Sequence, residues 1–142
     1  MNRTLPNKEV DTLLASFGPE VRDLALATRA FVLQIPGITE QVDVKGRIIG
    51  YGYGPKYADM VCVIMPTKAG VTLGIAHAIE LPDPEKLLRG AGKLHRHVKL
   101  KSKSDLESAA LKSLLKASSA AATARREKSG QKPKKEAKRT TV

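Results

Sequence analysis

Apolar residues near the start of the chain recur every three or four positions, as they do along one face of an α-helix. Pro6-Asn7 opens a first short helix, whose apolar face is Val10, Leu13 and Leu14. Gly18-Pro19 ends this helix and starts a second one, because Pro suits the first helical turn. The second helix continues to a stop at Pro36-Gly37. Its apolar face consists of Val21, Leu24, Ala25, Val32 and Ile35.

From residue 38 onward the apolar period changes to two, which indicates β-strands. The pattern predicts strands over 38–44, 47–53, 57–65 and 71–75. The third strand is apolar on both faces at Val61-Cys62-Val63-Ile64, so we expect it at the centre of a sheet. Because short turns join antiparallel neighbours, the short separations between these segments predict an antiparallel meander.

A fifth strand and a last helix complete the pattern. Leu94 to Leu100 alternates, which puts Arg96, Val98 and Leu100 on one face and His95, His97 and Lys99 on the other. Ser104 to Glu107 has the sequence of a capping box, with Ser at the N-cap and Glu at the third helical position. Helices before and after an antiparallel sheet of about five strands predict an α+β two-layer sandwich, with the N- and C-terminal helices on one face.

Positive charge is concentrated in two segments of this chain. The 142 residues include 25 Lys and Arg against 14 Asp and Glu, which gives a net charge of +11. Residues 86–103 contain seven basic side chains and no acid, and residues 123–142 contain eight basic and two acidic ones. The end of the chain has almost no bulky apolar residue to offset the entropy of ordering. We therefore expect a domain over 1–117 and a basic tail over 118–142 that is disordered past about Thr123. As an alternative, Ala120–Arg126 could extend the preceding helix part of the time.

The composition also excludes several classes of protein. The longest apolar run, Met60 to Met65, is far shorter than the ~20 residues of a membrane helix, and the N-terminus lacks the apolar stretch of a secretory signal. A single Cys excludes a disulfide framework. We expect a cytoplasmic protein without a membrane span. Aromatic residues make up only 4% of the chain, so few side chains could stack on single-stranded nucleic acid.

The uncompensated positive charge of residues 86–103 favours attraction of an anion, either nucleic acid or a phosphorylated small molecule. The candidate anion-binding residues are Lys86, Arg89, Lys93, Arg96, Lys99 and Lys101. Within this segment, Gly90-Ala-Gly-Lys93 could form a nest of backbone N–H groups or a plain structural turn. It is not a nucleotide-hydrolysing loop, because Leu94 stands where the Walker pattern needs Ser or Thr.

Three other features have both a functional and a structural interpretation. Tyr51 and Tyr53 share one face of a strand and could line a ligand groove, but core packing is favoured. His95 and His97 have a spacing compatible with a shared metal, although the surrounding Lys and Arg side chains would repel a cation. Cys62 lies in the most apolar strand, where a buried inert thiol is expected. No catalytic constellation stands out, so we expect a non-catalytic binding domain.

Several segments of the chain form a recognisable family pattern. They are Gly50-Tyr-Gly-Tyr-Gly-Pro55, Gly70-Val-Thr-Leu-Gly74, Leu81-Pro-Asp-Pro-Glu-Lys-Leu-Leu-Arg-Gly-Ala-Gly-Lys93, Arg96-His-Val-Lys-Leu100 and Ala110-Leu-Lys-Ser-Leu-Leu115. Together they resemble the YdhG-like family of uncharacterised bacterial domains over residues 10–117. The resemblance implies a frataxin-like α/β sandwich and offers no settled catalytic residues. The chain departs from the family pattern Glu-Gly-Thr-Gly-Lys, because Arg89 replaces the acid and Ala91 replaces the Thr.

Some relatives look like iron chaperones, so the resemblance implies iron binding as an alternative function. Hard cations prefer oxygen ligands, and the candidate carboxylates are Glu20, Asp23, Glu40 and Asp43. Basic side chains are interleaved with these acids, and Arg89 adds positive charge where a metal cation would need the reverse. The leading hypothesis is therefore binding of an anion without a cofactor, and the alternative is iron bound by surface carboxylates.

Overall fold

Two helices precede the sheet, as the 3.6-residue period predicts. The protein was studied as a computed structural model, which describes residues 7–78, 81–82, 88–90 and 96–128. Helix α1 spans Lys8–Leu14 and is capped by the Asn7 side chain, which accepts a hydrogen bond from the Glu9 N–H. Helix α2 spans Pro19–Val32. Both helices bury most of the apolar faces expected from the sequence. However, α2 ends at Val32, before the expected stop at Pro36-Gly37, so Ile35 lies after the helix and is only half-buried.

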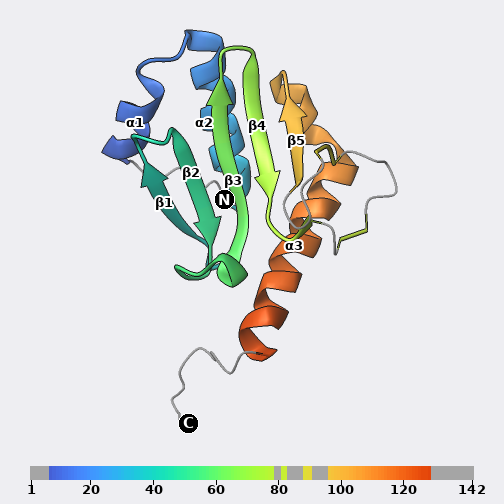
Figure 1. Ribbon diagram of the computed structural model, residues 1–142. Helices are drawn as coiled ribbons and strands as arrows, with labels where there is room; N and C mark the ends of the chain where they lie inside the picture. The colour runs from blue at the N-terminus through green and yellow to red at the C-terminus, as the bar shows by residue number, and fades with distance from the viewer. Residues whose placement is uncertain (1–6, 79–80, 83–87, 91–95, 129–142) are drawn as a thin grey trace.

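The middle of the chain forms a five-stranded sheet of sequential antiparallel neighbours (Figure 1). Its strands are β1 (Thr39–Asp43), β2 (Ile48–Gly52), β3 (Met60–Thr67), β4 (Gly70–Ile75) and β5 (Arg96–Leu100). The strand order β1-β2-β3-β4-β5 puts the most apolar strand, β3, in the centre, as predicted. The antiparallel meander expected from the short turns is confirmed.

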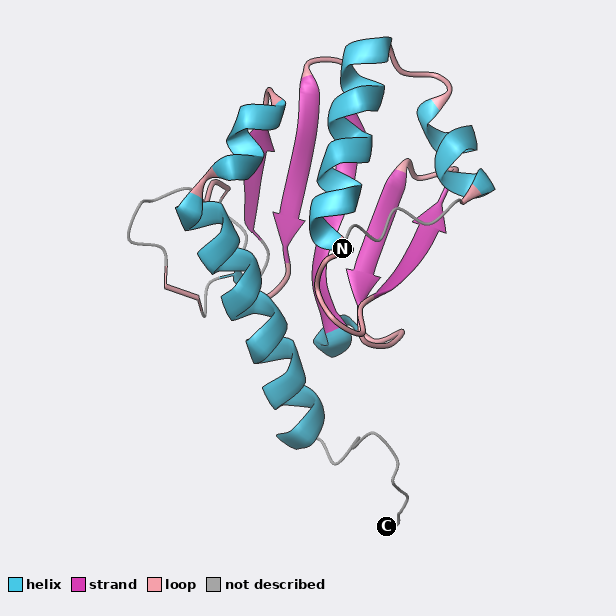
Figure 2. Ribbon diagram, turned by 180° about the vertical axis from the view of Figure 1, so that it is seen from behind, coloured by secondary structure: helices cyan, strands magenta, loops and turns pink. Residues whose placement is uncertain are grey.

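All three helices cover the same face of this sheet (Figure 2). The covered face contributes the core side chains Ile49, Ile64, Leu73, Val98 and Leu100, each no more than 7% exposed. Ile49, Ile64, Leu73 and Val98 lie opposite one another on successive strands, and Leu100 is two positions after Val98. Their side chains therefore point to the same face of the sheet. The α+β two-layer sandwich predicted from the sequence is therefore confirmed.

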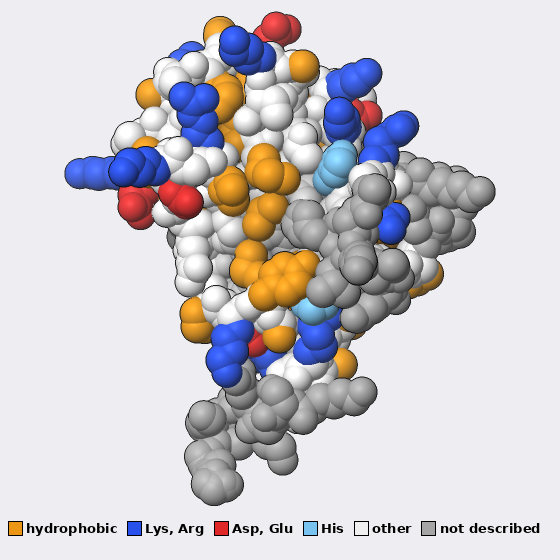
Figure 3. Space-filling view, viewed as in Figure 1, with side chains coloured by type: hydrophobic (Ala, Val, Ile, Leu, Met, Phe, Trp, Pro, Cys, Tyr) orange, Lys and Arg blue, Asp and Glu red, His pale blue; other side chains and the backbone are white. Residues whose placement is uncertain are grey.

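No described helix lies over the second face of the sheet, which we call the open face (Figures 1 and 2). By the strand register, Ile48, Val63, Met65, Thr72 and Lys99 belong to this face. Apolar side chains form a stripe along its middle, and Lys and Arg side chains gather at its ends (Figure 3). None of the described helices is both long and apolar enough to cross a membrane.

The third strand starts later than the alternation predicts. Residues Tyr57–Asp59 form a short 3-10 helix, η1, before β3 begins at Met60. The register between β2 and β3 shifts at Tyr51/Gly52. A Cβ at Gly52 would lie 2.5 Å from the Asp59 carbonyl oxygen, so the chain turns close to β2 at this point. The close approach explains why η1 interrupts an otherwise strand-like sequence.

The capping box of the last helix was assigned to the wrong serine. Ser104 lies inside a 3-10 helix, η3 (Lys103–Glu107), whose N-cap is Ser102. Asp105 closes this turn, because its Oδ2 accepts the backbone N–H groups of Lys101 at 2.7 Å and Ser102 at 3.1 Å. Helix α3 (Ala109–Lys128) begins later, with the Leu111 N–H donating to Ser108 Oγ at 3.2 Å.

The predicted domain boundary after residue 117 falls inside α3, which continues to Lys128. Residues 124–128 are therefore helical and not disordered, in agreement with the alternative that residues 120–126 extend the helix. The extra turns pack against the sheet and η1. Ser118 Oγ donates to the Val61 carbonyl at 2.9 Å, and Ala122 is fully buried. Arg126 Nη1 lies 3.0 Å from Oδ1 of the buried Asp59. Ser118 and Ala122 have small side chains, which allow this close contact.

Candidate anion-binding site

Several of the predicted cations lie where the last strand meets the β3–β4 turn. Lys99 is exposed on the open face of β5, and Lys101 is exposed just after that strand. Arg89 is also exposed, and its backbone exchanges two hydrogen bonds with His97, at 2.7 Å and 3.0 Å. Because directly paired residues of an antiparallel bridge share a face, Arg89 lies on the same face as His97 and Lys99.

Arg96 is separated from this group. It is paired with Ile75 of β4, whose side chain belongs to the covered face of the sheet. The alternation of side chains along β5 therefore turns Arg96 away from Lys99. The alternation in the sequence predicts that Arg96 and Lys99 lie on opposite faces, although both are among the candidate anion-binding residues. The structure brings together Lys99 and Lys101, puts Arg89 beside His97 on the same face, and leaves Arg96 on the other side of the sheet.

A hollow of about 400 Å³ lies between the β3–β4 turn and the end of β5. Its lining includes Lys99 and Lys101 together with the polar side chains of Thr67 and Thr72. Thr72 is directly opposite Lys99 across the β4–β5 ladder, so the Thr72 hydroxyl and the Lys99 ammonium group share the open face. We call this hollow, with Lys99, Lys101 and Thr72, the basic corner. Lys and Arg side chains gather at the upper right of Figure 3, with an acidic side chain beside them.

The backbone at the basic corner is closely packed. A Cβ at Gly70 would lie 2.5 Å from the Leu100 carbonyl oxygen, so only glycine allows the β3–β4 turn to approach β5 this closely. Thr67 stabilises the same turn, because its hydroxyl donates to the Gly70 carbonyl at 3.2 Å and accepts the Ala69 N–H at 3.3 Å. The turn therefore forms a firm wall of the hollow.

Negative charge near the basic corner is limited among the described residues. Asp105 is the acid held closest to Lys101, and its Oδ2 is engaged by two backbone N–H groups. No carboxylate of residues 7–78, 81–82, 88–90 or 96–128 forms a salt bridge with Lys99 or Lys101. The two ammonium groups can therefore attract an anion from solution.

Lys86, Lys93 and His95, which belong to the predicted basic segment, lie outside the described residues. The proposed nest at Gly90-Ala-Gly-Lys93 is described only at Gly90, which has a φ of 107°. A Cβ at this position would lie 3.3 Å from the His97 ring. The nest and the His95–His97 metal pair consequently stay predictions.

Tyr51 is a core residue. It is fully buried, and its hydroxyl donates to Glu40 Oε2 at 2.7 Å. Burial, together with the hydrogen bond to the Glu40 carboxylate, raises the pKa of Tyr51 far above its usual range. Tyr53 is half-buried and packs against the core. This placement agrees with the favoured prediction that Tyr51 and Tyr53 pack in the core and do not line a ligand groove.

Glu40 holds a buried polar cluster together. Its carboxylate accepts hydrogen bonds from Arg29, Asn7 and Tyr51 at 2.7–3.0 Å. Burial on its own raises the pKa of Glu40, but these hydrogen bonds, with that from Arg29 the strongest, lower it below its usual value. The hydrogen bond to Glu40 likewise raises the pKa of Arg29. Glu40 therefore serves as an internal ion-pair partner.

The other carboxylates of the iron hypothesis lie apart from this cluster. Glu20 and Asp23 are exposed on α2, and Asp43 Oδ1 accepts the Gly46 N–H at 2.9 Å in the β1–β2 turn. Within the described part of the chain, no three His, Cys, Asp or Glu side chains form a group that could hold a metal ion. Cys62 is fully buried, as expected, and burial raises the pKa of its thiol.

Comparison of the chain with protein-family models, curated proteins and solved structures finds no match. The resemblance to the YdhG-like family stays a prediction from the motifs. The two residues of the basic corner that the sequence did not suggest are Thr67 and Thr72. Thr72 could have been found only from the β4–β5 register, because nothing in its local sequence marks it as a neighbour of Lys99.

Proposed function

We propose that this protein binds phosphate-bearing anions at the basic corner. The observation that carries the proposal is the hollow of about 400 Å³, in which Lys99 and Lys101 flank the Thr72 hydroxyl. An ammonium group is a common phosphate ligand, and a hydroxyl can add a hydrogen bond to a phosphate oxygen. Arg89 adds a third positive charge on the same face. Binding, rather than catalysis, is the role proposed for this site.

Nucleic acid and phosphorylated small molecules share this chemistry, and a binding titration can distinguish them. We would measure fluorescence anisotropy with a labelled oligonucleotide, and competition by a nucleoside monophosphate, at several salt concentrations. For duplex DNA, each lysine that contacts a phosphate contributes about 0.9 to the slope of log affinity against log salt. If the monophosphate competes effectively at the same phosphate concentration, the site binds small ligands. If the oligonucleotide binds and the monophosphate does not compete, the site binds nucleic acid.

The double variant K99Q/K101Q tests the location of the site. It should weaken binding and reduce the salt slope by about two, that is, by about one per lysine. The matched control is K8Q/K45Q, which removes the same charge from exposed positions on α1 and the β1–β2 turn. Salt-independent binding, binding of neither ligand, or equal losses in the two double variants would contradict the proposal.

A further inference from the structure

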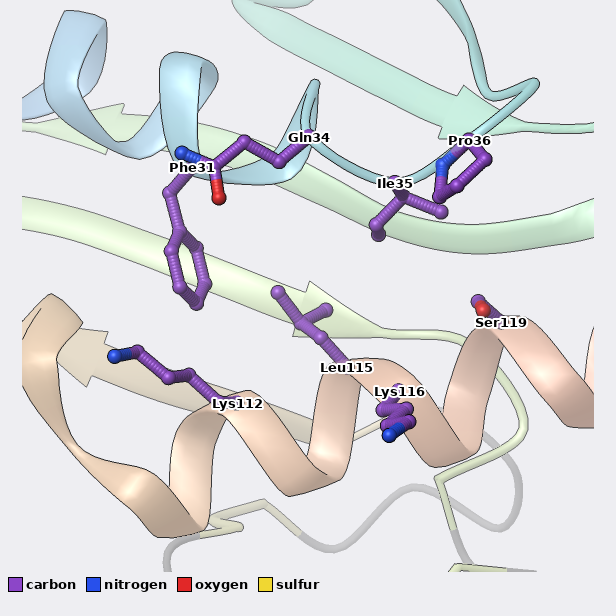
Figure 4. A pocket seen from close by; sticks show the side chains of 8 residues that line it. All are labelled: Phe31, Gln34, Ile35, Pro36, Lys112, Leu115, Lys116 and Ser119. Carbon is purple, nitrogen blue, oxygen red and sulfur yellow. The ribbon is translucent and has the colours of Figure 1, made fainter. Parts of the chain in front are cut away.

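A second hollow lies in the helical layer, between the end of α2 and α3 (Figure 4). Its volume is about 230 Å³. Phe31 and Ile35 form one side, and Leu115 of α3 lies opposite them. Phe31 and Ile35 are half-buried, and Leu115 belongs to the core. We call this hollow the helix groove, and its inner surface is mainly apolar.

Two lysines of α3 lie along the rim of the helix groove. Lys112 and Lys116 are four positions apart, so they lie on the same face of α3, one turn from each other (Figure 4). Both are exposed, and no carboxylate of the described residues forms a salt bridge with either. The rim therefore presents two ammonium groups beside an apolar surface.

We propose that the helix groove binds a small molecule with one carboxylate on a short apolar chain or aryl ring. The carboxylate would lie between Lys112 and Lys116, and the apolar part would cover Leu115 against Phe31. A cation would be repelled by the rim, whereas a fully polar anion would leave the apolar surface unused. Removing that apolar surface from water is favourable, so an apolar tail on the anion should strengthen binding.

The volume limits the size of the ligand. A cavity of about 230 Å³ holds roughly eight water molecules at ~30 Å³ each. It is smaller than the pockets of about 300–1,000 Å³ that hold drug-sized ligands. A specific protein partner needs an interface of about 1,000 Å² or more, much larger than this groove. A carboxylate with a chain of eight carbons or fewer fits these limits.

Octanoate, octanol and octylammonium form a matched set of probes, because they share a chain and differ in the charge of the head group. We would titrate each into the ¹⁵N-labelled full chain and follow the amide signals of Phe31, Ile35 and Leu115. Octanoate should shift these signals with the highest affinity and octylammonium with the lowest. The variant K112Q/K116Q should weaken octanoate binding about three- to tenfold, since each exposed ion pair contributes modestly. Its affinity for octanol should not change.

The two proposed sites can fail independently. The variant K99Q/K101Q should bind octanoate like the wild type, because these lysines line the basic corner and not the helix groove. Equal affinities for octanoate and octanol in the wild type would overturn the proposal. Amide shifts confined to residues outside the helix groove, an unchanged octanoate affinity in K112Q/K116Q, or no octanoate binding up to its solubility limit would overturn it as well.

Discussion

Arg29 of α2 and Glu40 of β1 form a two-point ion pair beneath the helical layer. Arg29 Nε lies 2.7 Å from Glu40 Oε2, and Nη2 lies 3.0 Å from Oε1. The two side chains are only 7% and 10% exposed. Asn7, the N-cap of α1, donates to the same carboxylate at 3.0 Å. The pair therefore links both N-terminal helices to the first strand of the sheet.

Replacing this carboxylate should destabilise the fold. Glu40→Gln keeps the shape of the side chain but leaves the Arg29 guanidinium buried without its counter-ion. Breaking a buried pair on one side costs about 3–5 kcal/mol. We expect a loss of about 3 kcal/mol in the free energy of unfolding, measured by urea denaturation at neutral pH. Glu9→Gln, on the exposed face of α1, is the control and should change stability little. A loss as small as that of the control would contradict a stabilising role for the pair.

The contribution of Glu40 should depend on acidity. Its pKa is lowered in the folded protein by the hydrogen bonds that outweigh burial, compared with about 4.3 in an unfolded chain. The ion pair therefore stabilises the fold fully above that unfolded value, and the stabilisation is lost as the pH falls through the folded-state pKa. The stability difference between wild type and Glu40→Gln should be constant from neutral pH down to about 5 and shrink below about 4. A difference that stays unchanged in acid would mean that the pKa of Glu40 is the same in the folded and unfolded protein, which would contradict stabilisation of the carboxylate by its hydrogen bonds.

The Tyr51 hydroxyl should also contribute measurably. Tyr51→Phe fills the same core space but removes the hydrogen bond to the Glu40 carboxylate. Hydrogen bonds to charged groups contribute about 1.5–3 kcal/mol, so we expect a loss of about 2 kcal/mol in urea denaturation. Tyr53→Phe is the matched control on a half-buried tyrosine and should change stability much less. Equal effects of the two substitutions would mean that the hydroxyl bond to Glu40 is unimportant.

The last turns of α3 should be part of the folded domain. A chain that ends at residue 117 lacks the Ser118 hydrogen bond to Val61, the buried Ala122 and the Arg126 partner of Asp59. A chain that ends at residue 128 retains all three. We expect thermal denaturation to show the shorter chain less stable by about 3 kcal/mol or more, because it loses apolar burial at Ala122, a buried hydrogen bond and the Arg126–Asp59 ion pair together. Equal melting temperatures would restore the domain boundary that the sequence suggested.

The sequence predicted the fold better than the site because the fold depends on local patterns. Alternation over 47–53 and 71–75 and the Pro19 helix start each mark an element directly. The short turns between strands then allow one simple topology. The sequence predicts the end of α3 only as a part-time extension over 120–126, because Ser118 and Ala122 look like tail residues until their contacts in the fold are known. The small size of these side chains is what lets the helix pack closely.

The candidate site was predicted only in part, because charge density along the sequence does not specify a face. Strand alternation separates Arg96 from Lys99, although both belong to the same basic segment. Thr72 lies in the basic corner because it pairs with Lys99 across β4 and β5, and the residues around Thr72 in the sequence do not indicate this pairing. Glu40 was proposed as a surface carboxylate, but its partner Arg29 lies eleven positions away on another element. Each of these differences comes from a long-range contact.

Mapping the bound ligand on the protein tests the central proposal most directly. We would record amide spectra of the ¹⁵N-labelled full chain with and without a saturating oligonucleotide, and again with a nucleoside monophosphate. Binding at the basic corner predicts that the largest shifts fall on residues 67–72 and 97–101, and that they disappear in K99Q/K101Q. Shifts centred on the helices or on the β1–β2 edge, or none at all with either ligand, would contradict it.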